Sequence, residues 1–276
     1  MDKNLLLTLG AESGSFHKIR FLSDFFVDKS RIKLTLFYVA PLKADEGFNA
    51  PRSCDLSLGE KIAGEARDML AERGFAPANM ETKVMCRRKG TVEDIREEAE
   101  LGLYDAVVLG SRGLTWLEEL VESSVGRGLL DQDIPFPVWI CNSPETEGRD
   151  VLLCMDDSEH ARRMADHVGF MVADQPETRV VLLHVDSKGQ AADRAVEGAR
   201  AALFEGRLSP DRVEVRVVQG GDVDRAIMAE VEAGRYGVVA VGMARSRVGP
   251  MARLFASPRC LKLKGRLEKA SLWVSK

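Results

Sequence analysis

The chain has 276 residues, of which 45% are hydrophobic and 30% charged, enough for one large or two medium globular domains. Its 39 basic and 43 acidic residues leave a net charge of -4, so no basic field attracts nucleic acid and we expect no nucleic-acid partner. The apolar run before Gly10 is too short for a signal-peptide core, and no segment approaches a membrane-spanning length. We therefore expect a cytoplasmic protein without a membrane partner.

The first half of the chain alternates apolar runs with amphipathic segments. Alternation and β-branched content predict strands over 5–9, 31–40, 82–86, 105–110 and 137–141. Helical spacing of apolar residues predicts helices over 19–26, 57–73 and 91–102, and one from about 124. We expect Thr91 to cap the third of these helices, with Asp94 three residues later.

The second half repeats this order. Strands are expected over 151–155, 179–185, 213–218, 237–242 and 271–274, and helices over 158–173, 190–206 and 222–233. Leu7 corresponds to Leu153, 146 residues later, whereas Gly110 corresponds to Gly242, only 132 residues later. The shorter spacing places an insertion at about 41–58 of the first copy. The polar stretch 143–150 reads as a linker between a domain over 1–143 and a domain over 150–276.

The cysteines and histidines give little support for a metal site. The five cysteines have no C-x-x-C spacing, so we expect reduced, buried or incidental thiols. The four histidines lack the short spacing of a zinc pair, and we expect no metal. The cysteines are Cys54, Cys86, Cys141, Cys154 and Cys260.

Strands that alternate with helices of ten to fifteen residues predict an α/β fold with a mainly parallel sheet. Such sheets bind ligands at the carboxyl ends of their strands, where the winding reverses. A strand that leads through a glycine loop into a helix suits phosphate, because unpaired backbone N–H groups converge there. The loops that follow Thr8 and Leu109, and their equivalents in the second copy, are therefore the candidate site.

The glycine loop of the first copy carries a specific motif. Gly110 and Gly113 are followed by nine residues and then by Ser123 and Ser124. This loop resembles the G-x2-G-x9-G pattern, followed by Ser or Thr, of the ATP-binding universal stress proteins. The resemblance covers nearly the whole chain as two tandem copies. It implies two tandem Rossmann-like domains, similar to the adenine nucleotide alpha hydrolases, each with a five-stranded mainly parallel sheet flanked by helices.

The resemblance assigns a nucleotide site to the first copy. It implies that the Val39 backbone contacts the base and that the glycine loop holds the phosphates. Ser123 stands where the family has its third glycine, and Gly10 stands where the family has an adenine-contacting Asp. Ser123 or Ser124 can alternatively cap a helix. Six residues form the candidate site of the first copy: Val39, Gly110, Arg112, Gly113, Ser123 and Ser124.

In the second copy, the Asp that the first copy lacks is present, and the glycine loop is altered. Asp156 stands at the position of the adenine-contacting Asp, although it can alternatively form a turn or cap a helix. Arg245 replaces the second glycine, and its guanidinium can pair with phosphate instead. The equivalent candidate residues are Asp156, Val185, Gly242, Arg245, Ala256 and Ser257. The degenerate loop makes this site the less favourable of the two.

The chain lacks a P-loop lysine and an evident carboxylate pair for magnesium, so we expect no significant catalysis, although a weak ATPase stays open. The favoured hypothesis is a stress-response regulator that can bind ATP or ADP in its first copy. The alternatives are a structural or interaction module without nucleotide, and an enzyme of a related α/β class. In the family the terminal strands pair across domains or subunits, which suits the apolar runs around Trp139 and Trp273.

Overall fold

A computed structural model describes residues 1–11, 16–43, 54–110, 136–141, 148–186, 192–220, 222–242, 267 and 270–275. The elements of the first half are β1 (Lys3–Thr8), α1 (His17–Phe25), β2 (Ile32–Ala40), α2 (Ser57–Glu72), β3 (Met80–Cys86), α3 (Thr91–Leu101), β4 (Ala106–Leu109) and β5 (Val138–Ile140). Those of the second half are β6 (Asp150–Met155), α5 (Glu159–Val172), β7 (Val180–Asp186), α6 (Ala192–Glu205), β8 (Val213–Gln219), α7 (Val223–Ala233), β9 (Tyr236–Gly242) and β10 (Ser271–Ser275).

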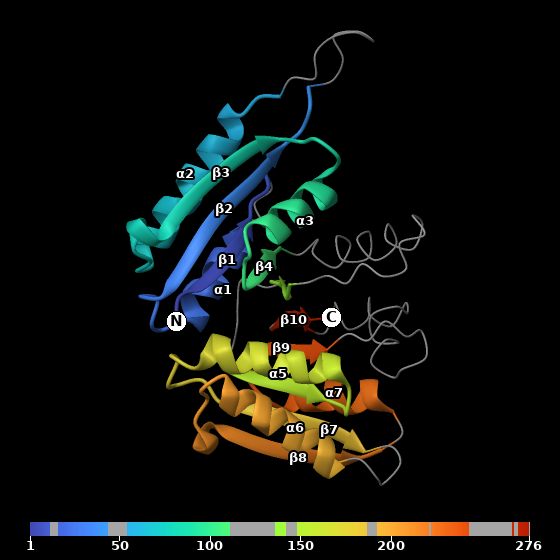
Figure 1. The fold of residues 1–276 in the computed structure, drawn as a ribbon. Coiled ribbons are helices and arrows are strands. Elements are labelled where there is room, and N and C mark those ends of the chain that lie inside the picture. The colour runs from blue at the N-terminus through green and yellow to red at the C-terminus, as the bar shows by residue number, and fades with distance from the viewer. Residues whose placement is uncertain are drawn as a thin grey trace.

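The strands form one sheet that runs through both halves of the molecule (Figure 1). Its ten strands have the order β3-β2-β1-β4-β5-β10-β9-β6-β7-β8. Neighbouring strands are parallel within each half, and β5 and β10 pair antiparallel at the joint. The α/β prediction is confirmed, and the two five-stranded sheets that we expected are joined edge to edge. The terminal strands therefore pair the two copies within one chain.

Helices cover both faces of the sheet (Figure 1). One face packs against α1, α2, α5 and α6, whose buried side chains belong to a single apolar cluster that spans both halves. The other face packs against α3 and α7 in a second cluster. Strands buried on both faces read as continuous apolar runs, which explains why 5–9 and 151–155 stood out in the sequence.

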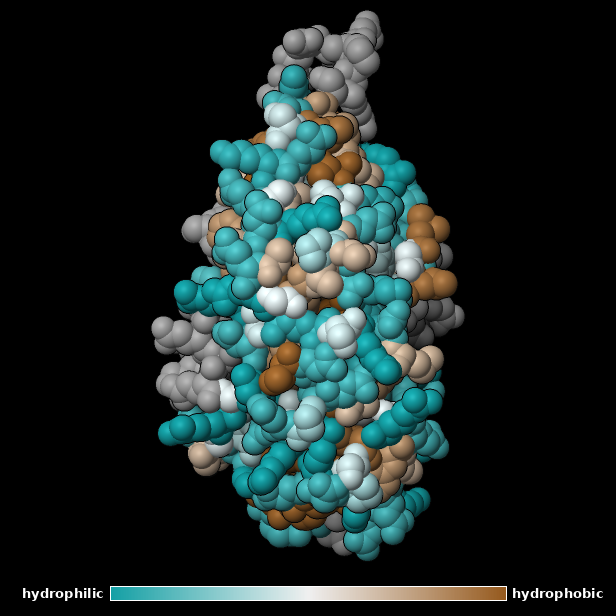
Figure 2. All heavy atoms as spheres, turned by 90° about the vertical axis from the view of Figure 1, so that its left-hand side faces the viewer, coloured by the Kyte–Doolittle hydropathy of each residue, from teal (hydrophilic) through white to brown (hydrophobic). Residues whose placement is uncertain are grey.

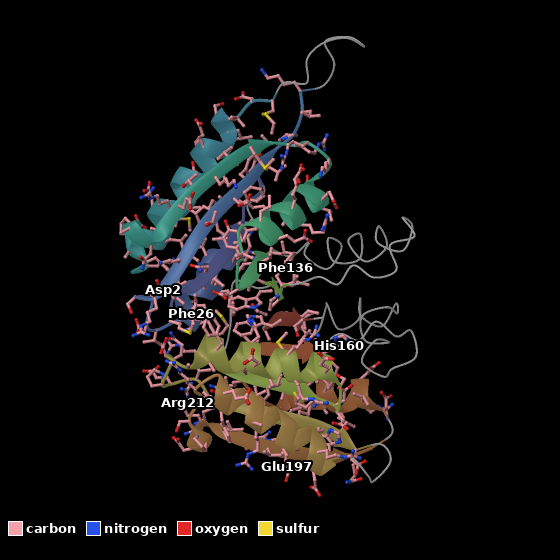
Figure 3. All side chains as sticks on the ribbon, in the orientation of Figure 1. Asp2, Phe26, Phe136, His160, Glu197 and Arg212 are labelled. Atoms are coloured by element: carbon pink, nitrogen blue, oxygen red, sulfur yellow. A yellow bond between two sulfur atoms is a disulfide. The ribbon has the colours of Figure 1, made fainter. Side chains whose placement is uncertain are left out.

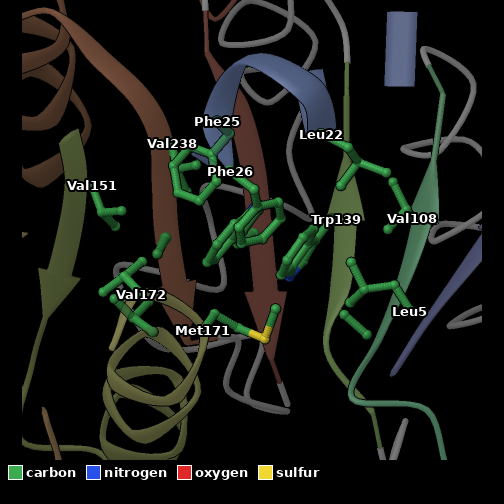
Figure 4. Packing of buried hydrophobic residues seen from close by; sticks show 14 of the residues in the cluster. Leu5, Leu22, Phe25, Phe26, Val108, Trp139, Val151, Met171, Val172 and Val238 are labelled. Atoms are coloured by element: carbon green, nitrogen blue, oxygen red, sulfur yellow. The ribbon is translucent and has the colours of Figure 1, made fainter. Parts of the chain in front are cut away.

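Two stacked indoles lie at the centre of the joint. Trp139 of β5 faces Trp273 of β10 with ring centroids 3.9 Å apart and planes 3° from parallel. Both rings are fully buried. Figure 4 shows Phe25 and Phe26, at the end of α1, beside Trp139. The two tryptophans therefore pack against each other in the core, where the two halves meet.

Polar contacts also cross the joint. Lys3 is buried and its Nζ lies 2.7 Å from Asp174 Oδ2. The buried Gln175 side chain accepts from the Val27 and Asp28 N–H groups and donates to the Asp28 carbonyl. Because these groups lose water on burial, their mutual pairing fixes how one half sits on the other.

The expected cap of α3 differs in the structure. Gly90, not Thr91, is the N-cap residue of α3, with φ of 143°, and it has no side-chain capping bond. The buried Asp94 carboxylate instead accepts from the Arg88 and Lys89 N–H groups of the preceding turn. The capping prediction was therefore wrong. The predicted helix from about 124 lies outside the described residues.

The structure also bears on the expected insertion and on the expected state of the cysteines. Residues 41–56 separate β2 from α2, whereas only 187–191 separate β7 from α6, as the insertion predicts. Cys54, at the end of this segment, forms a disulfide with Cys86, so the reduced state that we expected for these two residues was wrong. Cys141 and Cys154 are buried free thiols, as expected, and Cys260 lies outside the described residues.

The described surface is mostly polar. Figure 2 shows one face on which hydrophilic residues predominate and hydrophobic residues form small, separate areas. Within the described residues, no helix is both long and apolar enough to cross a membrane.

Candidate functional site

The candidate site of the first half lies where the winding of the sheet reverses. β1 pairs with β2 on one side and with β4 on the other, so the connections from β1 and β4 leave the sheet at neighbouring carboxyl ends. Thr8 Oγ1 donates to the Val108 carbonyl over 3.0 Å, and the Leu9 N–H donates to the Phe37 carbonyl over 2.7 Å. These bonds fix the ends of β1, β2 and β4 side by side.

The structure places three of the expected positions at this edge, at the ends of the first, second and fourth strands. Gly10 follows β1, and Val39 lies one residue before the end of β2. Val39 is partly buried and packs against the second apolar cluster. Gly110 directly follows β4, next to the end of β1. The sequence prediction therefore brings Val39 and Gly110 to one edge, whereas Arg112, Gly113, Ser123 and Ser124 lie outside the described residues.

A buried lysine occupies this edge, and the sequence prediction missed it. Lys18, in the first turn of α1, is 4% exposed, and its Nζ donates to the Thr8 carbonyl. A methyl group added at Gly110 would lie 3.7 Å from Lys18 Nζ, which is ordinary van der Waals contact. Of the described residues, Lys18 is the nearest to that position. An ammonium group thus stands beside the first glycine of the loop.

In the second half, Asp156 has a structural partner. Its Oδ1 accepts from the Ser158 N–H over 3.0 Å, and Ser158 Oγ in turn caps α5 by accepting from the Ala161 N–H. The carboxylate therefore shapes the turn that starts α5. This contact supports the turn-forming interpretation of Asp156.

Gly242 also has a structural explanation. A methyl group added there would lie 2.4 Å from the Ala161 nitrogen and 2.5 Å from the His160 carbonyl oxygen. Figure 3 shows His160 at the beginning of α5. The first turn of α5 thus packs directly on the end of β9, which only glycine permits. The first-half equivalents of these two residues, at 14 and 15, lie outside the described residues.

Two further polar side chains lie at the second-half edge, and the sequence prediction did not include them. His184 is buried and its Nδ1 lies 3.0 Å from the Met155 carbonyl oxygen. Asp186, the last residue of β7, accepts from Gln219 Nε2 over 3.3 Å. Val185 lies between them and packs against the second apolar cluster. Arg245, Ala256 and Ser257 lie outside the described residues.

The buried thiols near the two edges are unreactive near neutral pH. Burial raises the pKa of Cys141 to about 12, against the opposing effects of a hydrogen bond with Ser271 and of the Lys18 charge. Burial raises the pKa of Cys154 to about 12 as well. Since the thiolate is the reactive form, neither residue is a nucleophile near neutral pH. The described part of the chain also contains no group of three or more side chains that could hold a metal ion.

The disulfide lies at the outer side of the first-half edge. Cys86 ends β3, and Cys54 forms an isolated antiparallel bridge with Leu42, which follows β2. Cys54 packs against a small apolar cluster of Tyr38, Ala40 and Ile62. Both ends of the insertion are therefore tied to the carboxyl ends of β2 and β3.

Comparison with models of known protein families gave no match, and comparison with curated proteins gave none either. Solved structures do match. A universal stress protein from Archaeoglobus fulgidus DSM 4304 is 20% identical, and the alignment covers 99% of this chain and 96% of that one with a TM-score of 0.65. The cytoplasmic domain of a prokaryotic cation chloride cotransporter is 12% identical, with coverages of 100% and 95% and a TM-score of 0.58.

A protein of unknown function from Pseudomonas aeruginosa PAO1 is 14% identical, with coverages of 100% and 92% and a TM-score of 0.54. These alignments extend over both halves, so the doubled arrangement is itself shared. The likeness concerns the fold, because identities of this size say nothing about individual site residues. The chain therefore has the fold of the universal stress proteins, with two copies joined in tandem in one polypeptide.

Proposed function

We propose that the chain is a tandem universal stress protein, with domains over 1–143 and 150–276, that binds an adenine nucleotide in its first half. The position of Gly110 carries this proposal. Gly110 directly follows β4 beside the end of β1, at the point where α/β sheets bind their ligands. The backbone of a glycine there can approach a phosphate without interference from a Cβ atom.

The site that we propose comprises Val39 for the base and Gly110, Arg112, Gly113, Ser123 and Ser124 for the phosphates. ATP and ADP are the ligands that the loop motif favours. In the second half, Asp156 shapes a turn and Gly242 accommodates α5, so both residues have structural roles without a ligand. We therefore assign nucleotide binding to the first half alone, with Arg245, Ala256 and Ser257 in a loop that has lost the function.

The proposed protein is a cytoplasmic regulator without significant catalysis. Since β5 and β10 already pair the two copies, the chain needs no partner subunit at this joint, and a monomer and a dimer of tandems both fit. The runner-up function is an interaction module without nucleotide. The second half favours it, because its three described candidate residues, Asp156, Val185 and Gly242, are engaged in the fold.

Two measurements separate these functions. Purified protein is denatured and the released small molecules are separated by chromatography, and ADP is titrated into the native protein while the melting temperature is followed. Nucleotide binding predicts released ADP or ATP and a melting temperature that rises with ADP concentration. The absence of both results would leave the interaction module. ATP turnover above background that disappears with a single carboxylate substitution would instead support an enzyme.

A further inference from the structure

Lys18 is an unusual residue for the place it occupies. It lies in the first turn of α1, between His17 and Ile19, and its side chain is 4% exposed. Burial of an ammonium group costs free energy that burial of an apolar side chain does not. A lysine at such a position therefore calls for a reason beyond packing.

The repeat shows that packing does not require this lysine. With the spacing of 146 residues that relates Leu7 to Leu153, Lys18 corresponds to Met164 of α5. Met164 is fully buried in the apolar cluster of its half, and each buried residue of α1 corresponds to a buried residue of α5 in this alignment. The same helix in the same fold thus accepts an apolar side chain at this position.

The location of the ammonium points to a ligand. Its hydrogen bond to the Thr8 carbonyl holds Nζ at the carboxyl end of β1, and Gly110 of the glycine loop lies against it. The Lys18 charge also reaches the end of β5, since it lowers the pKa of Cys141 in opposition to burial. Lys18 therefore stands where β1, β4 and β5 end together.

Two aligned positions of this edge differ between the two halves. Asp156 after β6 corresponds to Gly10 after β1, and Met164 of α5 corresponds to Lys18 of α1. A carboxylate accepts from the amino and hydroxyl groups of a nucleoside, whereas an ammonium attracts phosphate. The first half has thus exchanged a group suited to a base or ribose for a group suited to an anion.

We propose that Lys18 is the anion-binding residue of the first-half site and that its ammonium contacts a phosphate group of the ligand. This inference rests on the proposed function for the location of the ligand. It assigns most of the affinity to the phosphate end, so inorganic pyrophosphate occupies the same place as the phosphates of ADP.

The test compares the wild-type protein with Lys18→Met, which introduces the residue of the second half. ADP, pyrophosphate and adenosine are titrated separately by calorimetry. We expect the affinities for ADP and pyrophosphate to fall about tenfold or more, because a charge-assisted contact is lost, and the affinity for adenosine to stay the same. Lys33→Met serves as the matched control, since it removes an equal charge from an exposed pair with Asp2.

The outcomes distinguish the inference from the proposed function. Wild-type protein that binds ADP, with no change in Lys18→Met, overturns the role of Lys18 and leaves the proposed function standing. If the wild-type protein binds pyrophosphate but not ADP, and Lys18→Met does not bind pyrophosphate, the result supports Lys18 as the anion-binding residue and contradicts nucleotide binding. Binding of neither ligand overturns both. If Lys18→Met does not fold, Lys18→Gln is measured in its place, and an unchanged affinity for ADP again overturns the inference.

Discussion

Gly242 shows how one residue can belong to a binding motif and also have a role in the fold. In sequence it is the first glycine of a phosphate loop, and in the structure it is the place where the α5 backbone approaches β9. The sequence could not separate these two roles, because both require the absence of a Cβ atom. Only the distance from Gly242 to the His160 and Ala161 backbone decides for the fold.

Gly242→Ala should therefore destabilise the protein. The added methyl group would lie 2.4 Å from backbone atoms, which have to shift, and such overpacking costs about 1–3 kcal/mol. Urea denaturation measures the difference in the free energy of unfolding. Gly110→Ala is the control, because its methyl group meets the flexible Lys18 side chain at 3.7 Å among the described residues. Equal stability of the two variants would show that Gly242 is not packed in this way.

His167 illustrates a site that the sequence did not reveal. Its Nε2 accepts from Trp139 Nε1 over 3.0 Å, and burial lowers its pKa from 6.5 to about 3. The equivalent residue of the first half is Phe21, 146 residues earlier. Accordingly, the buried Nε1 of Trp273 has no hydrogen-bond partner among the described residues. The two halves thus meet through an indole pair with unequal polar environments.

His167 should make stability depend on pH. Between pH 6.5 and about pH 3 the unfolded chain binds a proton that the folded chain excludes, so stability falls as the pH drops through this window. The limiting slope is roughly 1 kcal/mol for each pH unit. His167→Phe should lower stability at pH 7.5, because Trp139 loses its acceptor, and should flatten the slope. Urea denaturation between pH 4.5 and pH 7.5 measures both, and parallel curves would contradict the assignment.

At the scale of elements, periodicity predicted nearly all of the described strands and helices. Long apolar runs and helical spacing reflect burial, which depends on the same residues in any α/β sheet. The N-terminal cap of α3 was predicted wrongly, because Asp94 can bond either to its own helix or to the preceding turn, and the tertiary position of β3 decides. The disulfide was missed because two cysteines 32 residues apart carry no sequence signal of their contact.

The Cys54–Cys86 disulfide should stabilise the first half. It closes a segment that contains α2 and β3, so reduction should lower the free energy of unfolding by about 2–4 kcal/mol. Denaturation with and without dithiothreitol measures this difference, and Cys54→Ser should be insensitive to the reductant. Peptide mapping checks the bond directly. Alkylation of both cysteines without prior reduction would contradict it.

The reducing compartment that we proposed bears on this bond. Disulfides in cytosolic proteins are usually transient, because cellular thiols reduce them. The bond therefore describes the oxidised form of the protein. In the reduced form, the Leu42 bridge and the contacts around Tyr38 still connect the ends of the insertion to the first half.

At the scale of the whole molecule, the two halves form a single sheet with different residues at equivalent edges. The resemblance to the universal stress proteins implied the pairing of the terminal strands, which their apolar runs suit. The sequence did not predict the buried contacts of Lys3 with Asp174 or of Gln175 with the end of α1, because long-range polar pairs leave no local pattern. Lys18 was missed because the helix was predicted over 19–26, whereas α1 begins at His17.

The central claim is that one nucleotide binds to each chain, in the first half. Calorimetric titration with ADP tests this claim most directly in three proteins: wild type, Gly110→Ala and Asp156→Asn, which retains the acceptor for the Ser158 N–H. We predict a stoichiometry of one for the wild type, loss of binding in Gly110→Ala and unchanged binding in Asp156→Asn. A stoichiometry of two, or binding that is lost in Asp156→Asn but kept in Gly110→Ala, would contradict the account.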